Sequence, residues 1–464
     1  MLPRFEIVGR RRPVDLVSPG SVLVDEPVTH AASEHETPHP APYAAVCRTL
    51  DGPLDGKVCL DLASGDVRLT GWYDGARGGT GLVVETGGVA TTHRSRRAGR
   101  VTGPVDAVAL TLTGTHLTVL TRGDGAWTAR ARVDLQGRVD TRDEAWLGSL
   151  RTGQGCEGVA PVPGRLTAGG FGQLGLRDVR LVTHEDGRPV REGDGLLLTA
   201  TSAGPGFFDT AHTSVWSLAA DLELTHRADL FFRRPDRPGV FGDHATHLVR
   251  GDGRWLVATS TWGDFDRRRP GATVAVTLAS SEDDLLTGRH VLDTRPLVLP
   301  TTGMRSVGVW DPHLVRIDGA WHVGFVNASK FFRFHPALAA GPDLDALELC
   351  GAASDRTATE GTTLVELDGR WRVLASDGRE GRSGQRRGYP VFDLGLAEVG
   401  ALDAPYPTNI PWPTLVREGD GWLMVGFNGR PYGGSLVGYG SHGDVVLLRT
   451  RSEFRDEARV ALRL

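Results

Sequence analysis

The segment HLVRIDGAWHVGFV at 313–326 carries the pattern that decides the fold. A Leu-Val pair is followed by a short polar step, then by Asp-Gly, tryptophan and an apolar run. Asp-Gly supplies the positive φ values that a tight turn requires, and the flanking apolar alternation predicts a β-hairpin. The same pattern recurs in HLVRGDGRWLVATS at 247–260, TLVELDGRWRVLAS at 363–376, TLVREGDGWLMVGF at 414–427 and, with a longer loop and leucine in place of tryptophan, in RLVTHEDGRPVREGDGLLLTATS at 180–202.

The spacing of these hairpins predicts the architecture. Their aligned leucines are Leu181, Leu248, Leu314, Leu364 and Leu415, which are separated by steps of 67, 66, 50 and 51 residues. Each step is longer than one hairpin and leaves space for a second, so that the two together make a four-stranded blade. We therefore predict a five-bladed β-propeller over 170–464. Five unrelated hairpins in a β-sandwich are the alternative, which the shared register of the copies disfavours.

Residues 1–165 lack this repeat. Short strand-like runs such as THLTVLTR at 115–122 alternate apolar and polar residues, as in a half-exposed antiparallel sheet. This predicts an N-terminal β-sandwich, similar in general terms to lectin-like or jelly-roll modules, and hence an all-β protein. The stretch GVAPVPGRLTAGGFG at 158–172, rich in glycine and proline, is interpreted as the linker. Only 336–349 has the alanine and leucine spacing of a short helix.

Composition narrows the choice of partners. The 464 residues include 52 basic and 57 acidic side chains without a basic stripe, which argues against nucleic acid as the main partner. No run approaches the ~18 apolar residues of a membrane span, and the first residues lack the apolar stretch of a secretion signal, so we expect a cytoplasmic protein. The four cysteines lack metal-ligand spacing and are expected to be reduced core residues, with a Cys47–Cys59 bridge as the alternative.

The position three residues before each aligned leucine is the candidate site. In a propeller, residues just before the innermost strands lie at one mouth of the central channel, so equivalent positions converge. These positions hold Asp178, Ala245, Asp311, Gly361 and Trp412, and Glu360 directly precedes the glycine. Three carboxylates in one pocket suit the hydrolysis of a glycosidic bond, which uses an acid and a base. The alternative for each carboxylate is a cap on its own hairpin.

Four motifs around these positions resemble those of glycoside hydrolase family 43. They are LRDVRLV at 176–182, DHATHLV at 243–249, WDPHLV at 310–315 and TEGTTLV at 359–365. In that family, similar motifs run Arg-Asp-Pro, Trp-Ala-Pro-His, Asp-Pro and Glu-Gly-Pro through blades one to four. The resemblance covers about residues 170–450. This chain departs from the family pattern where Val179, Thr246 and Thr362 replace proline, so it resembles a distant branch.

The resemblance implies an inverting glycoside hydrolase with Asp178 as general base, Asp311 as pKa modulator and orienter, and Glu360 as general acid. Glu360 has to hold its proton at neutral pH, and an ionised Asp311 beside it would raise its pKa in that direction. Inversion requires the acid and base carboxyl groups to lie roughly 6.5–9.5 Å apart, whereas a separation of about 5 Å indicates retention.

The resemblance also implies the substrate, a furanoside or pentose-containing oligosaccharide or small glycoside, as for an α-L-arabinofuranosidase or β-xylosidase. Two alternatives stay open. One is a carbohydrate-binding propeller without catalysis. The other is a retaining fructosidase-type hydrolase, which the Arg177-Asp178 pair fits less well.

Further residues are candidates for substrate binding, namely Asp243, Trp310, Trp412, Arg305 and His442. Aromatic faces stack on sugar C–H groups, and arginine forks reach sugar hydroxyls. The alternatives are core packing for the tryptophans, turn capping for the aspartate, a solvated loop for the arginine and a structural role for the histidine. No His/Asp cluster has metal-ligand spacing, so no cofactor is expected, and a calcium ion in the channel would be structural only.

Overall fold

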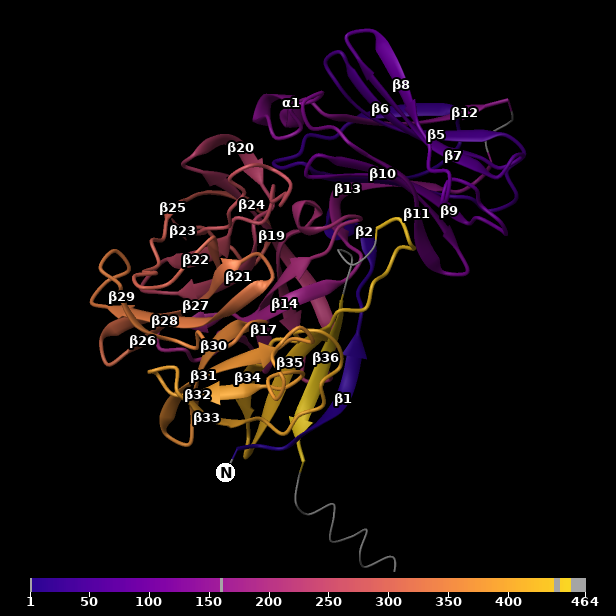
Figure 1. Ribbon diagram of the computed structural model, residues 1–464. Coiled ribbons are helices and arrows are strands. Elements are labelled where there is room, and N and C mark those ends of the chain that lie inside the picture. The colour runs from indigo at the N-terminus through magenta and orange to yellow at the C-terminus, as the bar shows by residue number, and fades with distance from the viewer. Residues whose placement is uncertain (1, 159–161, 438–442, 452–464) are drawn as a thin grey trace, which may run out of the picture.

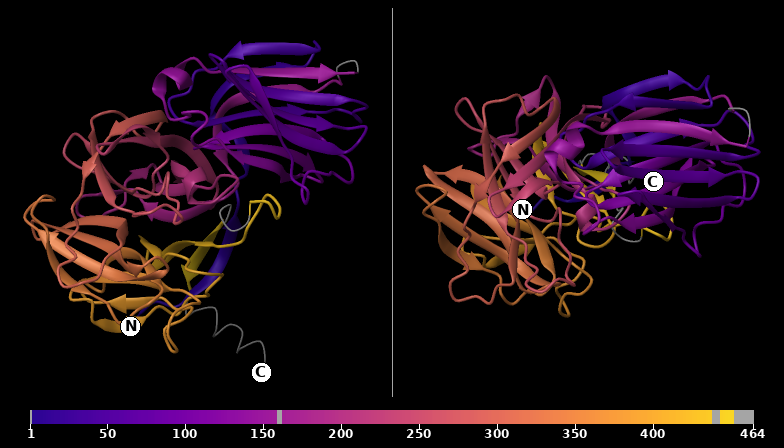
Figure 2. Two further views of the ribbon diagram at one scale, coloured as in Figure 1. Left: turned by 45° about the horizontal axis from the view of Figure 1, so that its top comes forward. Right: turned by 90° about the horizontal axis from the view of Figure 1, so that it is seen from above.

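The computed structural model describes residues 2–158, 162–437 and 443–451, and it is built almost wholly of β-strands (Figure 1). Within these ranges, five sheets surround a common centre, and two further sheets lie to one side of them (Figure 2). Helical segments within these ranges are α1 (Glu144–Gly148) and the 3₁₀ turn η1 (Phe208–Thr210). Neither has the length and apolar character needed to cross a membrane.

Each of the five central sheets has the repeated hairpin at its inner edge. The first sheet holds β14 (Leu176–Leu181), β17 (Gly195–Ser202), β18 (His212–Leu218), β19 (Leu224–Arg234) and β20 (Arg237–Phe241), with β16 (Arg191–Glu192) beside β17 and β24 (Gly288–Asp293) beside β19. The second holds β15 (Thr183–His184), β21 (His244–Arg250), β22 (Trp255–Ser260), β23 (Val276–Ser281) and β25 (Arg295–Pro296). The third holds β26 (Gly308–Ile317), β27 (Ala320–Lys330), β28 (Arg333–Gly341) and β29 (Glu348–Ala352). The fourth holds β30 (Thr359–Leu367), β31 (Arg370–Asp377), β32 (Pro390–Phe392) and β33 (Glu398–Ala401), and the fifth holds β34 (Thr414–Glu418), β35 (Gly421–Asn428), β36 (Asp444–Thr450) and β1 (Phe5–Arg11).

Hydrophobic side chains fill the gap between each sheet and the next. Leu230 of the first sheet and Val257 of the second belong to one buried cluster, and similar clusters join the second sheet to the third, the third to the fourth and the fourth to the fifth. The ring closes because Val425 of the fifth sheet packs in one cluster with Leu198 of the first. Five sheets closed in this way form a five-bladed β-propeller, with the aligned leucines in the inner strands β14, β21, β26, β30 and β34.

The fifth blade takes its outermost strand from the beginning of the chain. β1 pairs antiparallel with β36, with Phe5 opposite Thr450 (indigo beside yellow in Figure 1). This corrects the predicted division, which assigned all of 1–165 to the N-terminal sheets. A single strand outside the repeat leaves no pattern in the sequence, yet it covers the open edge of β36 and ties the two ends of the propeller together.

The other two sheets pack face to face over one core. One has the order β11 (Ala126–Asp134), β10 (His116–Gly123), β9 (Ala107–Thr113), β4 (Tyr43–Thr49), β13 (Arg165–Gln173), β2 (Asp15–Pro27). The other has the order β3 (Ala32–Glu36), β12 (Arg151–Glu157), β5 (Lys57–Ser64), β6 (Val67–Asp74), β7 (Gly79–Thr86), β8 (Val89–His93). Val46 and Leu110 of the first sheet share a buried cluster with Leu60 and Leu69 of the second. All four cysteines are free thiols, so the alternative Cys47–Cys59 bridge is absent.

The glycine-rich stretch predicted to be a linker is partly a strand. Residues 165–173 form β13, which lies between β4 and β2. A Cβ atom on Gly169 would lie 2.1 Å from the main-chain oxygen of Ser21, and one on Gly172 would lie 2.4 Å from that of Asp15. The glycines therefore allow β2, which is bulged opposite them, to approach β13 closely, and they do not make the segment flexible.

The helix predicted over 336–349 is also wrong, because this segment contributes to β28 and β29. Ala337 and Ala339 face the cluster shared with the second blade, and Leu338 faces the cluster shared with the fourth. A strand buried on both faces carries a continuous apolar run without the period-two alternation of a half-exposed strand. The run therefore gave no strand signal, and its helix-forming residues suggested the wrong element.

The two-sheet part packs against the first blade through a buried polar network. Asp229 of β19 lies 3.1 Å from Nε2 of His212 and 2.9 Å from Nε2 of His226. The other ring nitrogen of His226 lies 3.2 Å from the hydroxyl of Ser18 in β2. Tyr43 of β4 donates its hydroxyl proton to the main-chain oxygen of Ala211 at 2.8 Å. These contacts fix the first blade, including the loop before β18, against the N-terminal sheets.

Candidate active site

The inner strands of the first four blades share one distortion. Asp178, Ala245, Asp311 and Gly361 all have positive φ, at 53°, 61°, 58° and 75°. The pairing with the next strand shifts register at the same point in each blade, between 177 and 180, 244 and 247, 310 and 313, and 360 and 363. Such a bulge turns a residue out of the regular strand pairing. Three of the four residues are not glycine, and backbone strain of this kind at non-glycine residues is typical of functional sites.

Blade four uses the bulge differently from blades one and three. A Cβ atom on Gly361 would lie 2.3 Å from Cδ1 of Trp412, so the indole of blade five excludes a side chain there. The carboxylate of this blade comes instead from the preceding residue, Glu360. Glycine at the bulge therefore allows Glu360 and Trp412 to lie close together.

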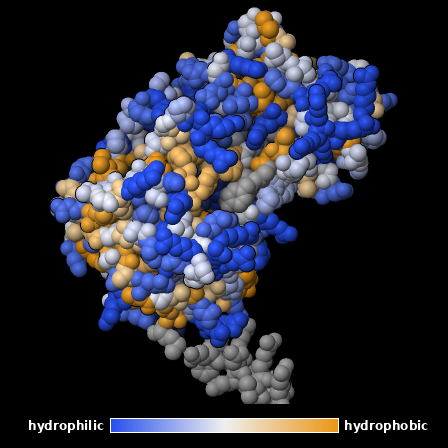
Figure 3. All heavy atoms as spheres, viewed as in Figure 1, coloured by the Kyte–Doolittle hydropathy of each residue, from blue (hydrophilic) through white to orange (hydrophobic). Residues whose placement is uncertain are grey.

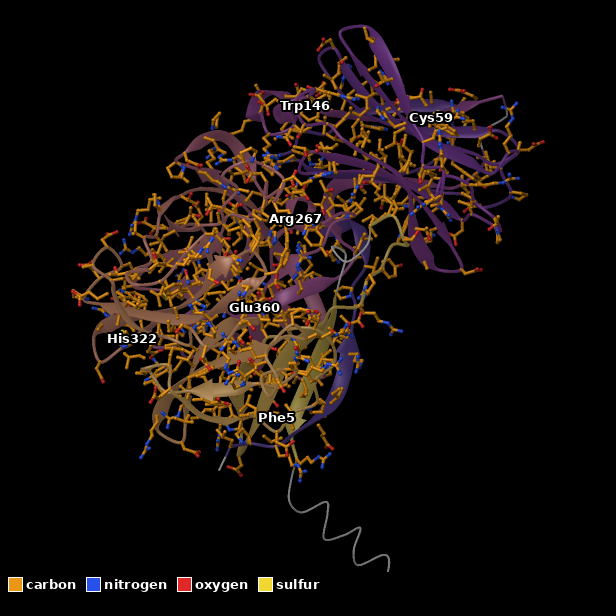
Figure 4. All side chains as sticks on the ribbon, viewed as in Figure 1. Phe5, Cys59, Trp146, Arg267, His322 and Glu360 are labelled. Atoms are coloured by element: carbon orange, nitrogen blue, oxygen red, sulfur yellow. The ribbon has the colours of Figure 1, made fainter. Side chains whose placement is uncertain are left out.

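The three carboxylates line one pocket at the centre of the propeller. Asp178 of β14, Asp311 of β26 and Glu360 of β30 share a cavity of about 200 Å³ with the indoles of Trp310 and Trp412. Figure 4 labels Glu360 near the middle of the ring of blades, and Figure 3 shows hydrophobic side chains beside a hollow in this face. The structure thus brings together three acidic groups that are far apart in the sequence.

Burial is the main influence on the ionisation of Glu360. It raises the pKa of Glu360 to about 8, and the charge of Asp178 acts in the same direction, while the indoles of Trp310 and Trp412 act against it. At neutral pH the carboxyl group therefore holds its proton, which is the state that a general acid requires.

The surroundings of Asp178 favour its ionised form more than those of Asp311 do. Burial raises the pKa of Asp178, but Nε of Arg177 lies 3.3 Å from its Oδ2 and opposes this rise. Burial raises the pKa of Asp311 well above its usual range, and the charges of Glu360 and Asp178 raise it further. A positive charge close to Asp178 makes this aspartate the better candidate for a base.

The sequence predicted that a charge on Asp311 raises the pKa of Glu360. Repulsion between two close carboxylates is mutual, and in the structure it raises the pKa of Asp311. For each of the two groups, burial acts on the pKa more strongly than this repulsion does.

A buried polar layer lies under the carboxylates. It is formed by the residues directly before the aligned leucines, which are Arg180, His247, His313, Thr363 and Thr414. The imidazoles of His247 and His313 stack with centroids 4.1 Å apart and planes 10° from parallel. The main-chain N–H of Leu314 donates to Nδ1 of His247 at 3.0 Å, and burial lowers the pKa of both histidines well below the usual range. Neutral rings therefore link neighbouring blades, a role that the sequence did not suggest.

The structure places some of the predicted substrate-binding residues in the pocket and others elsewhere. Trp310 and Trp412 line the pocket. Asp243 does not line it, because its fully buried carboxylate pairs with Arg234 and accepts the N–H of Gly263 at 3.0 Å. Arg305 lies at a separate surface depression of the third blade. His442 lies outside the described residues.

Several pocket residues were not predicted. The structure adds Arg177 and His244 at the inner end and a set of aromatic side chains, Phe208, Phe265, Phe331, Phe332, Phe334 and Phe427. The available signal was the clustering of phenylalanine in two loops, FF at 207–208 and FFRF at 331–334. Across the described ranges, no three His, Cys, Asp or Glu side chains are grouped so that they could hold a metal ion.

Known proteins resemble this chain in structure but not in sequence. In sequence, no family model and no curated protein matches the chain. In structure, a family 32 β-fructofuranosidase of Bombyx mori matches with 14% identity and a TM-score of 0.44, covering 59% of this chain and 60% of that one. A family 117 glycoside hydrolase of Zobellia galactanivorans matches with 12% identity and a TM-score of 0.42, covering 59% and 84%. A GH43_1 enzyme of Xanthomonas citri matches with 13% identity and a TM-score of 0.39, covering 59% and 86%. The chain is thus similar in structure to glycoside hydrolases of families 32, 43 and 117, at low identity.

Proposed function

We propose that this chain hydrolyses a glycosidic bond with inversion at the anomeric carbon, with Glu360 as general acid and Asp178 as general base. The observation that supports the proposal is the meeting of carboxylates from three blades in one pocket. There, burial raises the pKa of Glu360 to about 8, while Arg177 forms an ion pair with Asp178. Two carboxyl groups can act as an acid–base pair when the surroundings of one favour its protonated form and those of the other favour its ionised form.

In this reaction, Glu360 donates its proton to the glycosidic oxygen as the bond from that oxygen to the anomeric carbon breaks. Asp178 accepts a proton from a water molecule, whose oxygen bonds to the anomeric carbon from the opposite face. The leaving alcohol departs neutral, and the sugar carries a new hydroxyl of inverted configuration. Glu360 ends ionised and Asp178 protonated, and proton exchange with solvent restores the starting state.

Asp311 is proposed to orient the sugar rather than to transfer a proton. Its carboxylate accepts the main-chain N–H of Gly361, and its Oδ2 atom is buried without a hydrogen-bond partner among the described residues. A buried oxygen of this kind is costly unless a ligand supplies a donor. A sugar hydroxyl in the pocket would supply it.

The proposed substrate is a furanoside or other pentose-containing glycoside, cleaved as by an α-L-arabinofuranosidase or a β-xylosidase. A cavity of about 200 Å³ has room for about one sugar ring, which favours removal of a single sugar over binding of a long chain. The cytoplasm stays the proposed location.

The test is hydrolysis of a panel of 4-nitrophenyl furanosides and pyranosides, with product configuration read by NMR. We expect turnover of at least one pentoside with inversion, and its loss by about 10²–10⁴-fold in Asp178→Asn. The variant Glu360→Gln tests the general acid. Its matched control is Glu366→Gln, because Glu366 is an exposed glutamate on the same strand, β30. Binding of sugars without turnover would instead indicate a carbohydrate-binding propeller, and retained configuration would make Asp178 a nucleophile.

A further inference from the structure

A row of aromatic rings runs from Glu360 to the rim of the pocket. Trp310, whose side chain hydrogen-bonds Glu360, has its ring centroid 5.2 Å from that of Trp262. Trp262 stacks on Phe208 at 4.5 Å with planes 27° apart, and Phe208 meets Phe207 edge-on at 4.2 Å. Phe207 is 39% exposed. This aromatic row, Trp310–Trp262–Phe208–Phe207, therefore runs from the half-buried Glu360 at the inner end of the pocket to solvent.

Further aromatic side chains pack against this row and extend it to another part of the rim. The Phe265 ring lies 5.0 Å from Trp262 and 4.8 Å from Phe331, and Phe332 at the rim is 51% exposed. Of the eighteen described residues that line the pocket, ten are phenylalanine or tryptophan. Exposed aromatic side chains grouped at a pocket mouth indicate a binding surface for an apolar group.

The polar side chains of the pocket are gathered at its inner end, on or beside the bulges. They are Arg177, Asp178, His244, Asp311 and Glu360. The remaining one, Asn409, already accepts the main-chain N–H of Arg379 at its Oδ1 at 3.0 Å. A second sugar placed along the aromatic row would bury hydroxyls with few partners, and each such hydroxyl weakens binding by about tenfold.

The position of Glu360 indicates which part of the substrate meets this row. A general acid has to reach the oxygen of the leaving group, so the leaving group lies on the side of Glu360. Trp310, the first ring of the row, hydrogen-bonds Glu360. The sugar that is cleaved off then lies toward Asp178 and Asp311, where its hydroxyls find polar partners.

We propose that the aromatic row binds a flat, apolar aglycone, so that the substrates are single sugars joined to an aromatic or similarly apolar alcohol rather than to a second sugar. This inference rests on the proposed function, because it uses Glu360 as the acid that protonates the leaving group. It narrows the expectation from the sequence, which left oligosaccharides and small glycosides equally open.

The test compares the methyl and benzyl glycosides of the sugar that the panel identifies, because methanol and benzyl alcohol are leaving groups of nearly equal acidity. Burial of the phenyl ring is expected to raise kcat/KM for the benzyl glycoside about tenfold or more over the methyl glycoside. Phe208→Ala is expected to reduce this ratio toward one. If Phe208→Ala unfolds, Phe207→Ala, which removes an exposed ring, is used in its place and should also lower the ratio. The control is Val298→Ala, at a 78% exposed valine outside the pocket, which should leave the ratio unchanged.

Equal kcat/KM for the two glycosides would overturn the inference, and so would a Phe208→Ala variant that lowers both rates equally. If no glycoside is turned over, the proposed function fails by itself. The aglycone site is then tested by calorimetric titration of the unaltered chain with the methyl and benzyl forms of each pentoside in the panel. Tighter binding of a benzyl compound, lost in Phe208→Ala, supports the site, and equal or absent binding of all pairs refutes it.

Discussion

Arg180 of the first blade donates a hydrogen bond of 2.9 Å from Nη2 to the main-chain oxygen of Asp311 in the third blade. Its Nη1 donates to the main-chain oxygen of Thr362 in the fourth blade at 2.9 Å. Its guanidinium carbon lies 4.6 Å from the ring centroid of Trp412, before the inner strand of the fifth blade. One fully buried side chain therefore joins four blades directly beneath the three carboxylates.

Replacing this side chain by Arg180→Met should lower the free energy of unfolding by about 3–5 kcal/mol, because two buried carbonyl oxygens lose their donor. The charge of Arg180 also lowers the pKa of Asp178 and of Asp311, so its loss should move the acidic limb of the pH–rate profile to higher pH. Denaturant unfolding and kcat/KM against pH measure the two effects. Arg417→Met, which removes an arginine from an outer contact with Trp422, is the control. An acidic limb that does not move in a folded variant would contradict the electrostatic role.

The role of Glu360 as acid predicts a dependence on the leaving group. Glu360→Gln should lower kcat/KM by about 10²–10⁴-fold for an alkyl glycoside, whose leaving oxygen needs a proton, and much less for a 2,4-dinitrophenyl glycoside, whose leaving group needs none. Asp178→Asn should lower both, since the water must lose a proton in either case. Steady-state rates of both variants on the two substrates test this prediction. Equal losses for both substrates in Glu360→Gln would remove Glu360 from the acid position.

The raised pKa of Glu360 also makes stability depend on pH. Below pH 4.5 the group is protonated in the folded and unfolded chains alike, and between pH 4.5 and about 8 the folded chain binds more protons than the unfolded one. Stability should therefore fall as pH rises through this window, by about 3–5 kcal/mol from this group alone. Glu360→Gln should be more stable than the wild type at pH 8 and similar to it at pH 4.5, whereas Glu366→Gln should follow the wild type. A difference between Glu360→Gln and the wild type that is the same at both pH values would show that Glu360 is not buried as described.

The sequence was sufficient to predict that the three carboxylates meet in one pocket, because the register of each hairpin can be read from the local sequence. Asp178 and Asp311 stand at one position of the repeat, and the structure gives both the same bulge and the same pocket. What escaped prediction depends on contacts between distant segments. β1 pairs with β36 across the whole chain, and Glu360 owes its pKa first to burial, for which no motif stands in the sequence. Phe208 and the phenylalanines at 331–334 belong to different blades, so their common pocket shows only after folding.

The contact between Gly361 and Trp412 predicts that substitutions at two equivalent bulge positions differ in their effect on stability. Gly361→Ala places a Cβ atom against the indole at a φ of 75°, so it should lower stability by about 1–3 kcal/mol and displace Glu360, with a large loss of activity. Ala245→Gly, at the same bulge of blade two with a φ of 61°, should change stability by less than about 1 kcal/mol, because relief of strain and greater freedom of the unfolded chain oppose each other. Thermal unfolding of both variants checks this. Equal destabilisation would mean that the indole contact does not decide the residue.

The last prediction concerns the N-terminal sheets, which hold the loop that carries Phe207 and Phe208. Arg132 of β11 donates to the main-chain oxygen of Pro205 at 3.2 Å, and Nδ1 of His116 lies 3.4 Å from Oδ2 of Asp209. Arg132→Ala should loosen this loop and raise KM for the benzyl glycoside about three- to tenfold, with a smaller effect on kcat, because the loop orders the aglycone and not the carboxylates.

The same variant should show faster amide hydrogen exchange across 204–210, a readout that does not depend on turnover. Arg130→Ala is the matched control, since Arg130 stands on the same strand but bonds the Thr121 hydroxyl at 2.7 Å, within its own sheet. If both variants raise KM equally, or if exchange at 204–210 stays as in the wild type, the N-terminal sheets do not position the pocket through this loop. A rise confined to Arg132→Ala would tie the two-sheet part to substrate binding through Phe207 and Phe208, although none of the residues described for that part lines the pocket.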